Sequence, residues 1–133
     1  MGKVLDHSDS VKFLRDITRG GLAGILNELA CMTGLGIDIR ENDVPVGENV
    51  QAFCEVLGYD PLHMACEGKC IIIVSEPEAE RVELALKNHE SGKNAARIGK
   101  VTNLHPGELV LETMIGGHRL MEPPRAEKVP RIC

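Results

Sequence analysis

The stretch from Cys70 to Ser75 constrains the fold more than any other part of the sequence. It contains Ile71 to Val74, four branched apolar side chains in a row. Such residues favour a β-strand, and here they make both of its faces apolar. We therefore expect a strand at 70–75, in a central position of a sheet that is covered on both sides. This apolar run is far shorter than the roughly 20 residues that span a bilayer, so the pattern predicts no membrane protein.

Helical patterns surround this strand. Leu22, Ile25, Leu26 and Leu29 recur with helical period, and Gly34 is the expected end of that helix. A second amphipathic helix is expected over 50–57, ended by Gly58, and a capping box of Ser75 and Glu78 predicts a third helix that runs to about Asn88. A short first helix, capped by Ser8 or Ser10, is expected to carry Val11, Phe13 and Leu14.

Further strands are expected at 36–40, 96–103, 108–114 and 118–121, with turns at 105–107 and 116–117 and a polar loop at 90–94. Helices mixed with strands that end in hairpins favour an α+β fold, a mixed β-sheet covered by helices (α/β/α), over a doubly wound parallel sheet. We expect one domain at 11–121, a junction or leader at 1–10, and an extended, proline-containing tail at 122–133.

Composition excludes several function classes. A chain of 133 residues with a net charge of −5 is a poor nucleic-acid binder, because phosphate neutralisation needs clustered Lys and Arg. Only three aromatic residues are present, too few for a base-stacking platform. The start lacks the apolar stretch of a secretory signal, so a reduced, cytoplasmic protein is expected. Five cysteines cannot all pair within one chain, and Cys31 and Cys54 lie in apolar periodic stretches typical of core residues.

The first candidate site is the segment from Asp16 to Gly21, where a helix begins. Gly20 and Gly21 permit close backbone approach, and the free amides of a helix start attract anions. Arg19 has the planar fork that binds phosphate or carboxylate. The alternative is an ordinary turn with a threonine cap and a surface arginine.

The second candidate is the segment A-C-E-G-K-C at 65–70. Glu67 is either a carboxylate held at the mouth of a site or a solvated turn residue. Cys66 and Cys70 have the spacing CxxxC, a poor zinc signal without a second pair. His63 and His105 are isolated in the sequence, and a surface or capped histidine is the simpler interpretation for each.

The third candidate is the last residue, Cys133. A thiol at the end of a proline-stiffened tail is not explained by packing, and eleven extended residues reach about 35 Å. Such a tail suits a carrier that visits more than one site, whereas the alternative is an accidental exposed cysteine.

Taken together, these segments resemble the C-terminal domain of the HypE family of hydrogenase maturation proteins, within the AIR synthase-related (PurM-like) superfamily. R-D-I-T-R-G-G-L-A at 15–23 is similar to the superfamily's R-D-P-T-R-G-G-L-A, with Ile17 in place of proline. A-C-E-G-K at 65–69, I-G-G-H-R at 115–119 and the terminal P-R-I-C resemble HypE motifs. The resemblance covers nearly the whole chain, from Leu14 to Cys133.

The resemblance implies an ATP-dependent carbamoyl dehydratase. In HypE-like proteins the terminal cysteine, here Cys133, receives a carbamoyl group from the carbamoyltransferase HypF. The S-carboxamide is dehydrated to a thiocyanate, and the cyanide passes to iron on the HypC–HypD complex and then into the nickel–iron hydrogenase centre. It also implies the superfamily's C-terminal α/β/α fold and a homodimer.

Chemistry assigns roles to the candidate residues within that reaction. Nitrile formation requires a base for the amide protons, and Glu67 is the expected base. Cys133 is the covalent carrier, Arg19, Gly20 and Gly21 are expected to stabilise phosphate charge or to order the tail, and Lys69 is a possible electrostatic contributor.

Family members also carry a first domain that supplies most of the site for ATP and Mg²⁺, and this chain has none. We therefore expect it to fold but to show little activity alone. Three alternatives remain open: a selenophosphate synthetase or purine-biosynthesis domain, a non-catalytic thiol or metal module that uses Cys66, Cys70 and Cys133, and a plain dimerisation domain. The terminal cysteine disfavours the first of these, because its reactions need no carrier.

Overall fold

The computed structural model describes residues 11–17, 20–64 and 69–122. Strands and helices alternate along most of the chain, and the expected α+β class is confirmed. The elements are β1 (Val11–Asp16), α2 (Gly21–Thr33), β2 (Gly36–Arg40), α3 (Glu48–Leu57), β3 (Cys70–Val74), α4 (Ala79–Lys87), β4 (Gly99–Thr102), β5 (Leu109–Glu112) and β6 (His118–Leu120).

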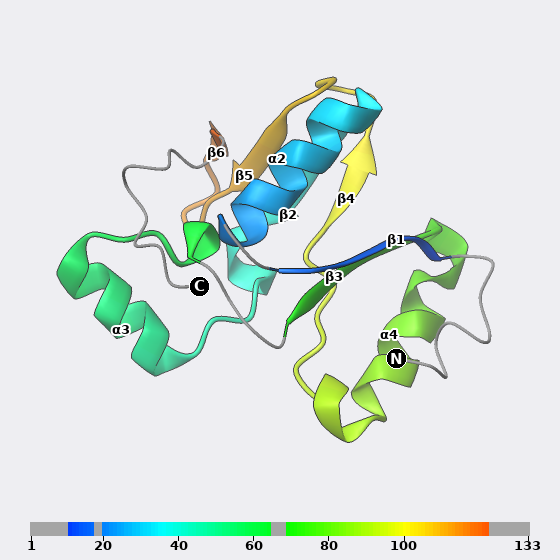
Figure 1. The fold of residues 1–133 in the computed structure, drawn as a ribbon, viewed down its shortest axis with the longest axis horizontal. Coiled ribbons are helices and arrows are strands. Elements are labelled where there is room, and N and C mark those ends of the chain that lie inside the picture. Colours follow the sequence, from blue (N-terminus) through cyan, green and yellow to red (C-terminus); the bar gives the residue numbers. More distant parts are fainter. Residues whose placement is uncertain (1–10, 18–19, 65–68, 123–133) are drawn as a thin grey trace.

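A mixed four-stranded sheet forms one body of the fold. Its strand order is β4-β2-β5-β6, in which β2 runs antiparallel to β4 and parallel to β5. Helix α2 lies along one face of this sheet (Figure 1). The hydrophobic core forms where the apolar stripe of α2 packs against the strands. Its buried residues are Leu22, Ala23, Leu26, Leu29, Ala30, Ile37, Ile39, Leu62, Leu109, Leu111 and Met121. Full burial of each large side chain contributes about 1.5–3 kcal/mol.

The remaining two strands, β1 and β3, form an antiparallel ribbon of their own. Leu14 lies opposite Ile72, and Asp16 lies opposite Cys70. The expected helix at 11–14 is therefore wrong, because these residues take their hydrogen bonds from a strand almost 60 positions later. The strand at 70–74 is confirmed. Its expected central position is wrong within the described residues, where its only partner is β1 and its side chains are half-buried.

The helix ends follow the glycine signals closely. Gly34 and Gly58 adopt left-handed conformations, with φ of 70° and 72°, directly after α2 and α3. Their amides bond the carbonyls of Ala30 and Cys54, as in a glycine C-cap. The capping box at Ser75 is wrong, because its side chain makes no cap bond and a 3-10 turn at Glu76–Glu78 precedes α4. The end of that helix near Asn88 is confirmed.

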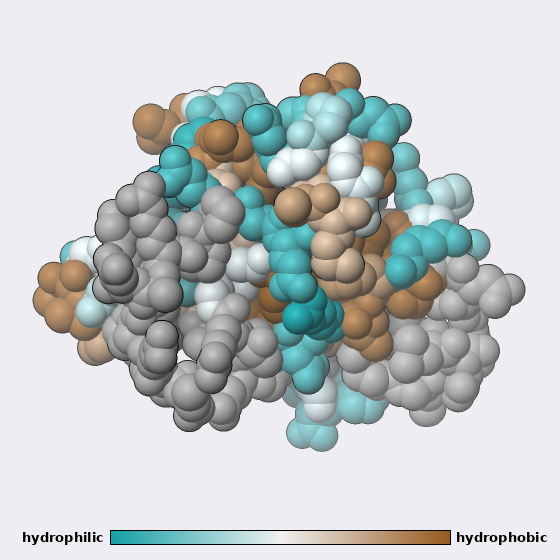
Figure 2. Space-filling view, turned by 45° about the horizontal axis from the view of Figure 1, so that its top comes forward, coloured by the Kyte–Doolittle hydropathy of each residue, from teal (hydrophilic) through white to brown (hydrophobic). Residues whose placement is uncertain are grey.

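Helix α3 is amphipathic as expected, yet its apolar face points outward. Cys54 is its one buried residue, whereas Val50, Phe53, Val56 and Leu57 are exposed. Figure 2 shows hydrophobic surface at the left edge of the molecule, the side on which α3 lies in Figure 1. Cys31, expected in the core, is also exposed, because it lies on the solvent side of α2. Cys54 is confirmed as a core residue.

The C-terminal strands are confirmed with shorter bounds than the pattern suggested, since their ends belong to turns. Gly107 and Gly116 adopt the positive φ of 77° and 87° that such turns require. A 3-10 turn at Glu90–Gly92 occupies the expected polar loop. No helix in the described part of the chain is long and apolar enough to cross a membrane. The leader at 1–10 and, apart from Glu122, the tail at 122–133 lie outside the described residues.

Candidate functional site

The predicted site residues divide into two groups. Gly20, Gly21 and Lys69 belong to the described structure, whereas Arg19, Glu67 and Cys133 lie outside it. The structure therefore informs on the predicted site through the residues that flank its three motifs.

Gly20 and Gly21 form the start of α2. Both have positive φ, 77° and 63°, which side chains disfavour. A Cβ at Gly21 would lie 2.5 Å from the Met64 carbonyl oxygen and 2.6 Å from that of Leu62. The second glycine thus admits the chain's own backbone at 62–64. The first turn of α2 has no acidic residue, which leaves the positive end of the helix dipole uncompensated by local charge.

Lys69 lies beside the end of β1. Its carbonyl oxygen accepts a hydrogen bond of 2.9 Å from the Ile17 amide, one step beyond the Asp16–Cys70 pair. This contact joins Ile17, inside the first motif, to Lys69, the last residue of the second motif. At the other end of the second motif, Gly21 contacts the backbone at 62–64, which directly precedes residue 65. The motif at 15–23 therefore contacts both the last residue of the motif at 65–69 and the backbone that directly precedes it.

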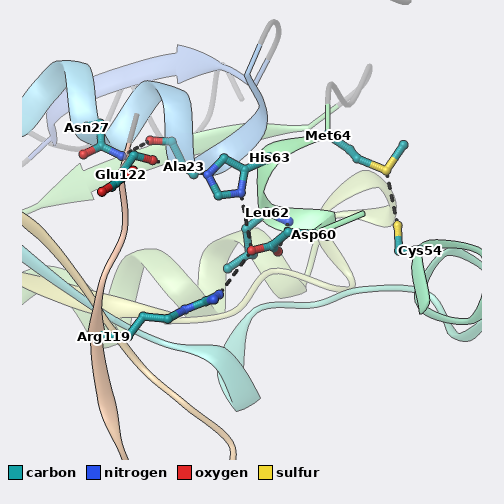
Figure 3. A network of polar contacts seen from close by, with 9 residues as sticks. All are labelled: Ala23, Asn27, Cys54, Asp60, Leu62, His63, Met64, Arg119 and Glu122. Atoms are coloured by element: carbon teal, nitrogen blue, oxygen red, sulfur yellow. Dashed lines mark hydrogen bonds and ion pairs between the residues drawn. The ribbon is translucent and has the colours of Figure 1, made fainter. Parts of the chain in front are cut away.

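A polar network links this region to the end of β6 (Figure 3). The carboxylate of Asp60 accepts from Arg119 Nη2 at 3.2 Å and lies 3.3 Å from His63 Nδ1. Its other oxygen accepts from the Leu62 amide at 3.0 Å, which starts the 3-10 turn η2 (Pro61–His63). His63 Nε2 lies 3.3 Å from the carbonyl oxygen of Glu122. Asp60 thus joins η2 to the strand that precedes the tail.

The network shifts the ionisation of both acidic and basic members. The hydrogen bond to Asp60 raises the pKa of His63 above its ordinary value, and the Glu122 carbonyl adds to this effect against burial. Burial alone would raise the pKa of Asp60, but hydrogen bonds from His63 and Leu62, with the charges of His63 and Arg119, lower it. Both shifts favour the charged forms of the pair.

Sequence reasoning missed this network. His63 was expected to be a surface or capped histidine rather than a ligand, and the structure gives it two partners, one of them 59 residues away. The available signals were the turn-forming Asp60-Pro61 pair with a histidine three residues after Asp60, and the arginine of the I-G-G-H-R motif. His105 likewise binds Asp38, through Nε2 at 2.5 Å.

Metal binding finds no support in the part of the chain that the structure describes. Among those residues no group of three His, Cys, Asp or Glu side chains could hold a metal ion. Cys70 is half-buried, and burial followed by the charge of Asp16 raises the pKa of its thiol. Cys66, its predicted neighbour in the CxxxC spacing, lies outside the described residues.

Comparison with known proteins identifies the family. The sequence matches the model "AIR synthase related protein, C-terminal domain" over residues 3–112. The chain belongs to this family. Among AIR synthase related proteins it is similar to carbamoyl dehydratase HypE of Azotobacter vinelandii, with 45% identity over 92% of this chain and 36% of that protein. The Escherichia coli K12 HypE is 43% identical over the same shares.

Solved structures agree with the predicted resemblance to HypE. The domain superposes on the hydrogenase maturation protein HypE in complex with ATP with a TM-score of 0.90 and 41% identity, covering 98% of this chain and 40% of that one. It also matches a HypE–HypF complex with a TM-score of 0.86 and 39% identity, over 92% of this chain and 39% of the other. The chain thus spans little more than a third of the length of the Azotobacter vinelandii and Escherichia coli HypE proteins.

Proposed function

We propose that this chain is the C-terminal part of a carbamoyl dehydratase of hydrogenase maturation, and that Cys133 carries the group on which it acts. The supporting comparisons are to HypE proteins, which are named carbamoyl dehydratases, and to HypE structures with ATP and with HypF. The proposed reaction converts an S-carboxamide and ATP into a thiocyanate, ADP and phosphate.

The reaction has two chemical demands. The carboxamide oxygen is a poor leaving group, so it first takes the γ-phosphoryl group of ATP while the nitrogen gives one proton to a base. The C–O bond then breaks, phosphate leaves with the oxygen, and the second nitrogen proton is removed to complete the C≡N bond. A base within hydrogen-bond reach of the nitrogen is therefore essential.

Glu67 is the proposed base, since the reaction needs a carboxylate that the tail can reach. Arg19 and the helix start at Gly20 and Gly21 are proposed to stabilise phosphate charge or to order the tail, with Lys69 as a further positive group. Gly21 is closely approached by the backbone at 62–64, which favours a structural share in its role.

One observation carries the proposal: the flanks of all three motifs meet at His63. Gly21 of the first motif packs on the backbone at 62–64, which directly precedes the second motif at 65–69. Glu122, the first residue of the expected tail and the last residue described, has its carbonyl oxygen 3.3 Å from the His63 ring. From this point eleven residues reach Cys133, about 35 Å of extended chain, while Glu67 lies at most about 14 Å from His63 by chain length. The tail is long enough for the thiol to meet the carboxylate and also a partner protein.

Partners and cofactors follow from the relatives as proposals. HypF is the proposed donor of the carbamoyl group, and the HypC–HypD complex is the proposed acceptor of cyanide. We propose that a homodimer of the full-length protein binds ATP and Mg²⁺ mostly through residues outside these 133.

Intact-mass spectrometry tests the proposal. A full-length HypE protein that carries this sequence as its C-terminal part is incubated with the carbamoyltransferase, carbamoyl phosphate and ATP. We expect a carbamoyl adduct on Cys133, followed by loss of one water. Cys133→Ser should accept no adduct, and Glu67→Gln should keep the adduct without losing water. Water loss at the normal rate in Glu67→Gln would reject the assigned base.

A further inference from the structure

The two residues that follow β6, Met121 and Glu122, are each held by contacts to other parts of the fold. Met121 is buried, and its amide donates to the Leu109 carbonyl at 2.8 Å, one residue after β6 ends. The next residue, Glu122, places its carbonyl oxygen 3.3 Å from His63 Nε2. Figure 3 shows Glu122 beside His63, near the turn of α2 that contains Ala23 and Asn27. Thus the described chain is fixed up to its last residue.

Both nitrogens of the His63 ring face oxygen atoms that can only accept. Nδ1 faces the Asp60 carboxylate at 3.3 Å, and Nε2 faces the Glu122 carbonyl at 3.3 Å. A neutral imidazole carries a single N–H, so it can serve one of these oxygens. The imidazolium carries two and can serve both. The charged ring therefore bridges the turn η2 and the root of the tail.

Asp60 is the fixed part of this bridge. Its carboxylate also accepts from Arg119 of β6 at 3.2 Å and from the Leu62 amide at 3.0 Å, so it is tied to both elements without His63. When the ring is neutral, the bond to a carboxylate is the stronger of the two and is the one retained. The bond to Glu122 is then the one that is lost.

We propose that His63, oriented by Asp60 and Arg119, is a positioning residue that anchors the root of the C-terminal tail, Glu122, to the turn η2. The anchor holds while the ring is protonated and releases Glu122 when the ring loses its proton. Its role in dehydration rests on the function proposed above, whereas the anchor itself does not. Among the described residues, the charged groups that act on the ring are Asp60 on its own turn and Arg119 on β6, whereas Glu122 contributes its backbone carbonyl.

The sequence offers an unusually clean probe of this anchor. Glu–Pro occurs twice in the 133 residues, at 76–77 and at 122–123. Labelling with carbonyl-¹³C glutamate and ¹⁵N proline leaves two cross-peaks in a carbon-detected carbonyl–nitrogen spectrum. The Glu122 peak reports the anchor, and the Glu76 peak is the internal reference.

His105 supplies a matched control variant. Its ring also lies between a carboxylate and a backbone carbonyl, those of Asp38 and Glu108, and it makes neither contact of the tail root. We expect the Glu122 carbonyl shift to titrate with the midpoint of the His63 ring in the unaltered chain and in His105→Gln, and to lose that titration in His63→Gln. A Glu122 carbonyl shift that does not change as the His63 ring titrates would overturn the anchor. This result can be obtained on the unaltered chain, so it does not depend on the folding of a variant.

Single-turnover kinetics in the full-length HypE context test the positioning role. In His63→Gln we expect unchanged carbamoylation of Cys133 and water loss slowed about tenfold, the worth of one charge-assisted hydrogen bond. The rate in the unaltered protein should fall as pH rises through the His63 midpoint, and this fall should be absent in His63→Gln. An unaltered rate in His63→Gln would overturn the positioning role. Titration of Glu122 without water loss in any protein would instead reject the proposed function and leave the anchor standing.

Discussion

Arg119 and Asp60 form an ion pair of 3.2 Å across 59 residues of sequence, and this contact fixes the end of the last strand against the turn before the second motif. Both side chains are partly solvated, so the pair adds little to stability by itself. Its value lies in orientation, since the same carboxylate faces His63 and the Leu62 amide. This partly exposed ion pair is therefore the central contact of a polar network that extends to Glu122.

Replacing Gly21 tests the close approach of the backbone at 62–64. Gly21→Ala should combine the strain of positive φ with a clash against two carbonyl oxygens, and should lower the free energy of unfolding by about 3 kcal/mol or more. Gly34→Ala is the matched control, because Gly34 has a similar φ of 70° but open space around its Cβ position. It should cost about 1 kcal/mol. Equal losses in urea denaturation would contradict the steric account.

The two histidine–aspartate pairs predict a pH dependence of stability. For His105, burial lowers the pKa, but the hydrogen bond and charge of Asp38 outweigh it and raise the pKa above its ordinary value of about 6.5. A raised pKa means that the pair stabilises the fold fully below that ordinary value and loses this contribution as pH rises through the higher pKa of the folded state. We expect unfolding free energy to fall over this window, and to fall less in His105→Gln. A pH-independent difference between the two proteins would contradict this.

Asp60 predicts the opposite pH dependence, a loss of stability as pH falls. Because the pKa of Asp60 is lowered in the fold, its contribution is present above about 3.8 and is lost as pH falls through the lower value of the folded state. Asp60→Asn should therefore weaken the fold near neutral pH and flatten the acid limb of its stability profile. Thermal unfolding between neutral pH and pH 3 measures both effects, and an unchanged acid limb would speak against the assigned charge state.

Thiol reactivity should follow the environments of the three described cysteines. Cys31 is exposed and should react first with a maleimide at neutral pH. Cys70 should follow, since its raised pKa leaves less thiolate, and the fully buried Cys54 should react only on unfolding. Peptide mapping of a time course gives the order, and early modification of Cys54 would show that α3 opens readily.

The chain alone should bind its family's nucleotide poorly. Relatives are more than twice the length of these 133 residues, and we expect the part of the relatives outside the matched region to supply most of the ATP site. ATP hydrolysis by the 133 residues should therefore stay near background, as measured by phosphate release. Efficient, ATP-dependent thiocyanate formation by this chain would refute that expectation.

Local signals predicted the helices better than the strand partners. The stripe that begins at Leu22 and the glycines at 34 and 58 determine α2 and α3, because periodicity and left-handed caps act over a few residues. The expected helix at 11–14 failed since nothing local reveals that β3 lies opposite. The outward face of α3 was equally hidden, because amphipathic period indicates a face but not what covers it.

The candidate site shows the same division. Gly20 and Gly21 were predictable as a special helix start, since their residue type states the backbone requirement. The anchor around His63 was not, because Asp60, Arg119 and Glu122 meet only after β6 pairs with β5. Nearby residues in sequence are therefore good guides to conformation here, and tertiary pairing decides which polar groups meet.

The placement of β2 has a consequence for how the polypeptide reaches its native state. Both of its neighbours come late in the sequence: β4 pairs with it from residue 99 onward and β5 from residue 109 onward. During synthesis β2 and the helix packed on it therefore stay incompletely packed until β4 and β5 have also emerged from the ribosome. Such high contact order predicts slow folding with a transiently sticky nascent chain, and so a dependence on chaperones at elevated temperature.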